Sequence, residues 1–265
     1  VLIENGADLN ILNRRKDCLI TYLVSEQYSS MSKMGRDKDL IEMVIYLMEH
    51  GAKPGLGNMG ANTSYNNRSL SLAGVTQWLP FESQEQWNRF RKLYVTKETV
   101  NLSSNSIGTT LFYDTLHGMD MNYKSFKLDS SPEEIIHLLE LGARLKDGYS
   151  RGTNRFVEYL GSPYIQPSKK VIRKFLDVIP SEPFHNDILD ASYEDTPALI
   201  LMIQKFPEFV SEMLNKGANP NAQISHTRGT RFYHTDGTES YSSDTTYGDT
   251  ALMVAVSQPD IVKAL

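Results

Sequence analysis

Two histidines and an aspartate that could hold a metal ion occur in one segment of the sequence. His226, His234 and Asp236 could meet across a hairpin, and imidazole and carboxylate groups are common zinc ligands. A single histidine in a loop is more often simply solvated, and no His-x-x-x-His or His-Glu-x-x-His pair occurs anywhere in the chain. The sequence therefore predicts no metal site.

Residues suited to covalent or acid–base catalysis lack the partners that such chemistry requires. Cys18 stands between Asp17 and Leu19 at the start of a predicted helix, where a buried, inert thiol is expected. Glu133 and Glu134 could act as a carboxylate pair, but they open an apolar helical run, where the helix dipole accounts for them. We therefore predict no catalytic residues and no enzyme in this chain.

A glycine-rich segment at residues 55–60, Gly-Leu-Gly-Asn-Met-Gly, fits the G-x-G-x-x-G pattern of dinucleotide sites, with Glu82 about twenty residues further on. That chemistry requires a buried strand before the glycines and a helix after them, so that the pyrophosphate meets the helix N-terminus. Here the segment follows a predicted helix and enters a polar stretch. We therefore predict a loop and no nucleotide cofactor.

Composition narrows the possible partners and the location of the protein. The 265 residues carry a net charge of −5, which disfavours broad electrostatic binding to nucleic acid or anionic lipid. The single cysteine excludes an internal disulfide, and no apolar run is long enough to span a membrane. The first residues lack the layout of a signal peptide, so we expect an intracellular, cytosolic protein.

A Gly-Ala pair closes four apolar, helix-periodic segments, and this repetition is the strongest signal in the sequence. Glycine after a helix C-cap adopts the left-handed conformation without Cβ strain, so each pair predicts a helix end. Upstream residues such as Ile41, Val44 and Ile45 recur at helical spacing. The four segments are residues 2–8, 47–53, 139–144 and 214–219.

A second helix with a Thr-Pro-Leu-like opening complements each Gly-Ala segment. The best examples begin at Thr196-Pro197 and Thr250-Ala251, where threonine is the expected N-cap and proline suits the first helical turn. Weaker openings occur at Thr109-Thr110 and Asn154-Arg155. The sequence thus predicts repeated pairs of short helices.

This pattern resembles the ankyrin repeat, a unit of a β-turn finger and two antiparallel helices with the signature Thr-Pro-Leu-His-x-Ala. Leu199 and Met253 stand where the family usually has its histidine. The resemblance implies an all-α ankyrin-type solenoid over residues 1–265, in one array without a single closed core. The expected units are 1–10 (partial), 11–54, 55–104 (degenerate), 105–146, 147–182, 183–221, an insertion at 222–247, and 248–265 (partial).

The insertion is the main departure from the repeat. Alternating residues on either side of a Thr-Asp-Gly-Thr turn at 235–238 predict a β-hairpin over residues 224–247. Arginine and aromatic side chains dominate protein–protein hot spots, so we expect the hairpin to contact a partner. The residues expected to do so are Arg228, Arg231, Phe232, Tyr233, His234 and Tyr241. The alternative is a loop that packs only on itself.

A cluster of aromatic residues in the degenerate unit is a second candidate contact region. Trp87, Phe90 and Tyr94 have helical spacing, which favours a place in the core. Trp78 and Phe81 lie on a predicted connection, where they could be exposed to a partner.

The resemblance extends to a function. Divergent, insertion-bearing ankyrin arrays without the signature histidine are similar to those of secreted effectors of intracellular bacteria such as Legionella, or of large DNA viruses. This implies a monomeric module that recognises a partner protein, in that case a host cytosolic protein, through the concave finger and first-helix surface and the insertion. Two alternatives remain: the ankyrin part of a larger enzyme or toxin with its catalytic domain outside these residues, and a structural spacer. Both ends interrupt a repeat, which predicts a longer array.

Overall fold

The structure is a computed structural model in which the described residues are mainly helical, as the sequence predicts. These residues form two compact units, Val1–Gly152 and Thr153–Leu265, which are treated separately below. The boundary falls inside the predicted unit 147–182. The described residues are 3–14, 17–20, 22–23, 38–54, 81–102, 110–116, 120–121, 126–127, 129–146, 154–163, 165–181, 185–233 and 239–265.

The first unit has a core made by the apolar faces of short amphipathic helices. On α2, Ile41, Val44 and Ile45 are fully buried, as their spacing predicts. The elements are α2 (Lys38–Glu49), α4 (Gln84–Tyr94), α5 (Leu111–Leu116), β1 (Asp120–Met121), β2 (Phe126–Lys127) and α6 (Pro132–Glu140). β1 and β2 pair as a small antiparallel hairpin between α5 and α6.

Paired charges join three helices of the first unit. Arg91 of α4 makes a two-pronged ion pair with Glu134 of α6, with N–O distances of 2.5 and 3.2 Å. Both side chains are largely buried, so removing one would leave the other poorly solvated. On the exposed side of α4, Arg89 contacts Glu42 and Glu49 of α2.

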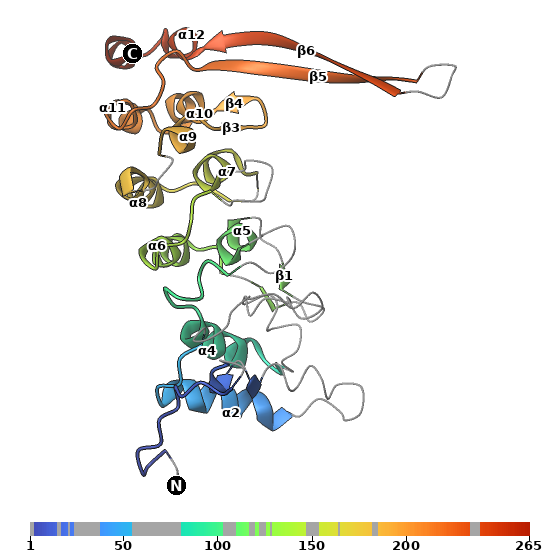
Figure 1. The fold of residues 1–265 in the computed structure, drawn as a ribbon. Coiled ribbons are helices and arrows are strands. Elements are labelled where there is room, and N and C mark those ends of the chain that lie inside the picture. Colours follow the sequence, from blue (N-terminus) through green and yellow to red (C-terminus); the bar gives the residue numbers. More distant parts are fainter. Residues whose placement is uncertain are drawn as a thin grey trace. The chain divides into compact units, whose positions relative to one another are not determined.

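The described part of the second unit contains three successive pairs of helices and one additional short helix between the first two pairs. Its helices are α7 (Arg155–Gly161), α8 (Lys169–Val178), α9 (His185–Leu189), α10 (Ala198–Lys205), α11 (Val210–Asn215), α12 (Ala251–Ala255) and α13 (Pro259–Ala264). The first helices α7, α10 and α12 pack in one row, and α11 packs against α13 in a second (Figure 1). In that second row, Arg173 of α8 bonds Glu212 of α11 at 2.6 Å and lies over the Phe209 ring. Short 3-10 turns, η1 (Ile179–Ser181) and η2 (Pro207–Phe209), follow α8 and precede α11.

Three helices end with the same hydrogen-bonding motif at a Gly-Ala pair, as the sequence predicts. The glycine N–H donates to the carbonyl three residues before it, and the alanine N–H donates to the carbonyl five residues before it. This is the Schellman arrangement, which requires a left-handed residue. The three glycines accordingly have positive φ: Gly51 (+97°), Gly142 (+85°) and Gly217 (+100°).

An asparagine side chain links segments about forty residues apart at two places in the first unit. Asn101 donates from Nδ2 to the carbonyl oxygen of Gly142 and accepts at Oδ1 from the N–H of Arg144, both at 2.8 Å. Asn10 makes the same two bonds, at 3.0 and 2.8 Å, with residues 51 and 53. One side chain therefore ties each of these Gly-Ala turns to an earlier part of the chain.

One predicted helix cap differs from the structure. Thr196 does not cap α10, because Thr196-Pro197 forms strand β4 and pairs with β3 (Ser192–Tyr193); Pro197 takes the cap position without a side-chain bond. Thr250, in contrast, caps α12 by accepting from the N–H of Met253, as predicted. α8 continues into the η1 turn, with Ile179 fully buried, whereas α2, α6 and α11 are followed by Gly-Ala.

The insertion forms the longest strands of the described chain, which confirms the predicted hairpin. β5 (Gln223–Tyr233) and β6 (Glu239–Thr250) pair antiparallel from Gln223 with Thr250 to Tyr233 with Glu239, with a bulge near Ser225. The predicted turn at 235–238 lies outside the described residues. We call these two strands the ribbon; Figure 1 shows it extending away from the helices of the second unit.

Candidate partner-binding surface

The ribbon gathers most of the contact residues predicted from the sequence. Arg228, Arg231, Phe232 and Tyr233 lie on β5, and Tyr241 lies on β6. His234, Trp78 and the glycine-rich segment at 55–60 lie outside the described residues, as does Asp236.

The strand register divides these residues between the two faces of the ribbon. Successive residues of a strand belong to opposite faces, and directly paired residues share a face. Arg231 pairs with Tyr241, and Tyr233 is two positions further along β5, so all three positions belong to one face. Arg228, paired with Asp244, and Phe232, paired with Ser240, belong to the other face. The arginine and two tyrosines on the first face form the denser group of hot-spot residue types.

The base of the ribbon is anchored to the helical part of the second unit by backbone bonds. The N–H of Ser225 donates to the carbonyl of Asp195 at 3.2 Å, and the N–H of Ala251 donates to the carbonyl of Ala222 at 2.9 Å. Asp195 belongs to the tight turn between β3 and β4, where Glu194 has a left-handed φ of +52°. The short β3–β4 hairpin therefore holds the helix-proximal end of the ribbon through the Ser225–Asp195 hydrogen bond.

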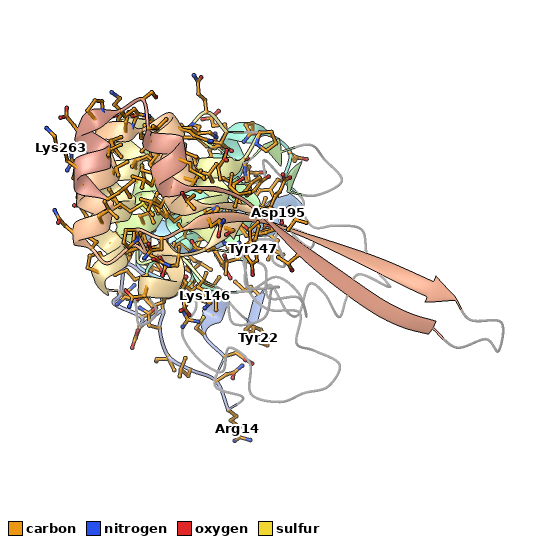
Figure 2. The ribbon with its side chains drawn as sticks, turned by 90° about the horizontal axis from the view of Figure 1, so that it is seen from above. Arg14, Tyr22, Lys146, Asp195, Tyr247 and Lys263 are labelled. Atoms are coloured by element: carbon orange, nitrogen blue, oxygen red, sulfur yellow. The ribbon has the colours of Figure 1, made fainter. Side chains whose placement is uncertain are left out.

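Tyr247 is a surface residue that the sequence analysis missed. It lies on β6 opposite Ser225, and its side chain is 71% exposed. Figure 2 shows Tyr247 and Asp195 where the ribbon leaves the helices, whereas Lys263 of α13 lies on the far side of the unit. Pairing with Ser225 puts Tyr247 on the same face as Arg231 and Tyr241. Tyr241 and Tyr247 are an even number of residues apart in the sequence, so in one strand they share a face. This spacing is the signal that could have identified Tyr247.

Phe81 belongs to the core of the first unit and not to a contact surface. Its side chain is 2% exposed and packs edge-on against Trp87 and Phe90, at ring-centroid distances of 5.2 and 5.1 Å. Aromatic pairs in this geometry add to the stabilisation from burial alone. Trp87, Phe90 and Tyr94 are also buried, as their helical spacing predicts.

Cys18 and Tyr94 are buried together in the first unit. The Cys18 thiol is 1% exposed, as expected for an inert thiol. Burial raises the pKa of the Tyr94 hydroxyl far above its ordinary value, with Cys18 contributing further. A phenol held neutral in this way is a core group and a poor general base.

The remaining chemical candidates are explained by local structure. Ser131 caps α6 by accepting from the N–H of Glu134, so the adjacent acidic residues stand at the positive end of the helix dipole. Arg155 and Glu158 of α7 form a buried ion pair at 2.7 Å. Among the described residues, no three His, Cys, Asp or Glu side chains gather in a way that could hold a metal ion.

A patch of exposed apolar side chains lies on the last helix pair. It consists of Leu252, Met253 and Val256, which are all more than half exposed. On the same helix, Ala251 and Ala255 are buried, and α12 packs against α10. We place the candidate contact surface on the ribbon, because the ribbon carries the arginine and aromatic residues typical of hot spots.

None of the helices in the described ranges combines the length and apolar character needed to cross a bilayer. Comparison of the chain with protein-family models, with curated proteins and with solved structures yields no match.

Proposed function

We propose that the chain is an ankyrin-type repeat module that recognises a partner protein through the ribbon and the adjoining row of first helices. The ribbon carries this proposal. It spans 28 residues, projects from the helices, and contains two arginines and four aromatic residues but no lysine (Figure 1). Interfaces favour arginine and aromatic residues and disfavour lysine, because the former bury large, rigid surfaces at little entropic cost.

The ankyrin-type assignment is supported by repeated local geometry. Short helix pairs stack in two rows in the second unit, and three helices end in the same glycine-dependent motif. Side-chain links of the Asn101 type recur at the equivalent point of another repeat. In repeat arrays of this kind, neighbouring units stabilise each other, and insertions form the recognition surface.

The proposed partner is a protein, and an effector-like role would make it a protein of the host cytosol. The acidic net charge of −5 disfavours nucleic acid as the main ligand. Hot-spot residues at the centre of an interface each cost about 2 kcal/mol or more on truncation to alanine, so a few substitutions should abolish binding.

Affinity capture from host-cell lysate with two matched variants tests this proposal. The first variant combines Arg231→Ala, Phe232→Ala and Tyr233→Ala in the ribbon. The control combines Asp260→Ala and Lys263→Ala, which are exposed positions of α13; Figure 2 shows Lys263 on the side of the unit away from the ribbon. We expect the ribbon variant to lose the captured protein, the control to retain it, and both to keep helical circular dichroism. Equal capture by the ribbon variant and the wild type would refute the ribbon as the recognition site.

A further inference from the structure

We infer that the outer edge of β6 receives an extended, basic strand of the partner, which adds to the ribbon as a third strand. This inference rests on the proposed function, because it names how the ribbon would bind. β5 and β6 form a sheet of their own, with no third strand among the described residues. A two-stranded ribbon is only marginally stable in water, and a third strand gives it the pairing it lacks. Each of its strands is an edge strand, with a row of backbone groups directed outward.

The anchoring of the ribbon leaves β6 as the accessible edge. β5 lies beside β4, and the N–H of Ser225 already bonds the carbonyl of Asp195 on that side. β6 lies on the opposite side of β5 from the β3–β4 hairpin (Figure 1). A strand arriving at the outer edge of β6 therefore approaches from the side away from the β3–β4 hairpin, whereas one arriving at β5 meets the β3–β4 turn.

The β6 edge lacks lysine and proline, two residue types that protect natural edge strands against strand addition. Residues 223–250 contain neither residue type, and 11 of these 28 residues are serine or threonine. Strand addition obtains its affinity from main-chain hydrogen bonds and its specificity from alternate side chains. Because the affinity comes from the main chain, an edge rich in serine and threonine can accept an added strand.

Charge determines which kind of strand can add. β6 carries three acidic residues, Glu239, Asp244 and Asp249, and no basic residue. Asp244 lies opposite Arg228 of β5, whereas neither Glu239 nor Asp249 has a basic residue directly opposite in the register. Opposite charges across neighbouring strands stabilise pairing, and like charges destabilise it. Pairing of β6 with β6 of a second copy would bring acidic residues together, which disfavours self-association through this edge. A strand that carries lysine or arginine has the complementary charge.

Selection of peptides from a displayed library of random ten-residue sequences, using the whole 265-residue chain as target, tests the inference. We expect selected peptides to be rich in lysine, arginine and β-branched residues. Methylating alternate backbone amides of a selected peptide keeps its side chains and charge but removes N–H donors. Two methylated peptides are compared, one with methyl groups on the odd-numbered amides and one with methyl groups on the even-numbered amides. One of the two should lose two or more hydrogen bonds of about 1 kcal/mol each, so its affinity should fall more than tenfold. Amide hydrogen exchange should slow at residues 239–249.

Variants of the protein provide a second readout. Glu239→Gln and Asp249→Asn should each weaken binding of the peptide about 1.5- to 5-fold, the range for a cross-strand charge pair, while Ser242→Ala should have little effect. Hydrogen exchange in β5 reports whether the hairpin is intact in each variant. A library that yields no binder, selected peptides without basic residues, or binding unaffected by both methylation patterns would overturn strand addition. If strand addition fails but protein capture still depends on Arg231, Phe232 and Tyr233, the proposed function stands without strand addition. If the peptide test and the capture test both fail, the ribbon is not a recognition site.

Discussion

Asn101 and Gly142, forty-one residues apart, are joined by a 2.8 Å hydrogen bond from the asparagine Nδ2 to the glycine carbonyl oxygen. The same side chain accepts from Arg144, so one residue satisfies two backbone groups of the turn that follows α6. Gly142 must be left-handed to end the helix, and this turn geometry directs its carbonyl toward Asn101. A local helix-ending signal is thereby coupled to a contact between segments about forty residues apart.

Replacing Asn101 by alanine should destabilise the first unit by about 1–2 kcal/mol, because two hydrogen bonds of about 1 kcal/mol each are lost. Asn101→Asp keeps the acceptor for Arg144 but loses the donor to Gly142, so its loss should be smaller. A carboxylate oxygen already accepts a similar backbone bond elsewhere in the chain: Oδ1 of Asp190 accepts from the N–H of Asn219 at 2.8 Å. Urea unfolding measures both changes; an alanine variant as stable as the wild type would contradict the role of this link.

Gly161→Ala should destabilise the second unit by about 1–3 kcal/mol through overpacking. A Cβ at this position would lie 2.2 Å from Cγ of Tyr193 and 2.7 Å from its Cβ, so the β3 strand would have to move away from α7. Gly248→Ala is the matched control, because its Cβ would lie 3.4 Å from Ile224, an ordinary contact. Thermal unfolding compares the two, and Tyr193→Ala should partly rescue Gly161→Ala. Equal stability of the two glycine variants would disprove the close packing.

Glu194→Asn should stabilise the second unit by about 0.5–1 kcal/mol. Glu194 has a left-handed φ of +52° in the β3–β4 turn, which costs a residue with a Cβ about 1–2 kcal/mol, and asparagine tolerates this conformation better. Glu194→Gln, which removes the charge but keeps the left-handed cost, should have little effect. The midpoint of urea unfolding reports the difference, and an equal gain from Glu194→Gln would contradict the assignment of strain.

The stability contribution of Glu208 should disappear in acid. Its hydrogen bond from Lys169, at 2.6 Å, lowers the pKa of the carboxyl group below its ordinary 4.5. A carboxyl group with a lowered folded-state pKa stabilises the protein above its unfolded-state pKa and loses that contribution as pH falls through the folded-state value. Glu208→Gln should therefore be less stable than the wild type at pH 7, and the gap should close below about pH 4.

Salt provides the control for the Glu208 prediction. The pair is exposed, so its effect is small and should shrink further in 1 M salt, where the Debye length is about 3 Å. Lys169→Gln should reproduce the pH-dependent gap. A gap between Glu208→Gln and the wild type that stays constant from pH 7 to pH 3 would show that the ion pair is not its cause.

The sequence alone predicted the features that depend on a few neighbouring residues. The Gly-Ala pairs identified helix ends, because a left-handed residue after a helix strongly favours glycine, and Gly51, Gly142 and Gly217 have that conformation. Helical spacing identified the buried residues Trp87 and Phe90, and strand alternation around a turn signal identified the ribbon. Each of these patterns lies within one element, so its physical cause is readable from residue type and spacing.

Tertiary structure decided the features that join distant elements. Thr196 lost its expected role as a cap because pairing with β3 placed it in a strand, and Phe81 is buried because an aromatic cluster formed beside it. The register of the ribbon decided that Arg231 shares a face with Tyr241, since shifting the pairing by one residue would move every side chain to the other face. Such pairings depend on packing between segments tens of residues apart, and residue types along one segment do not determine them.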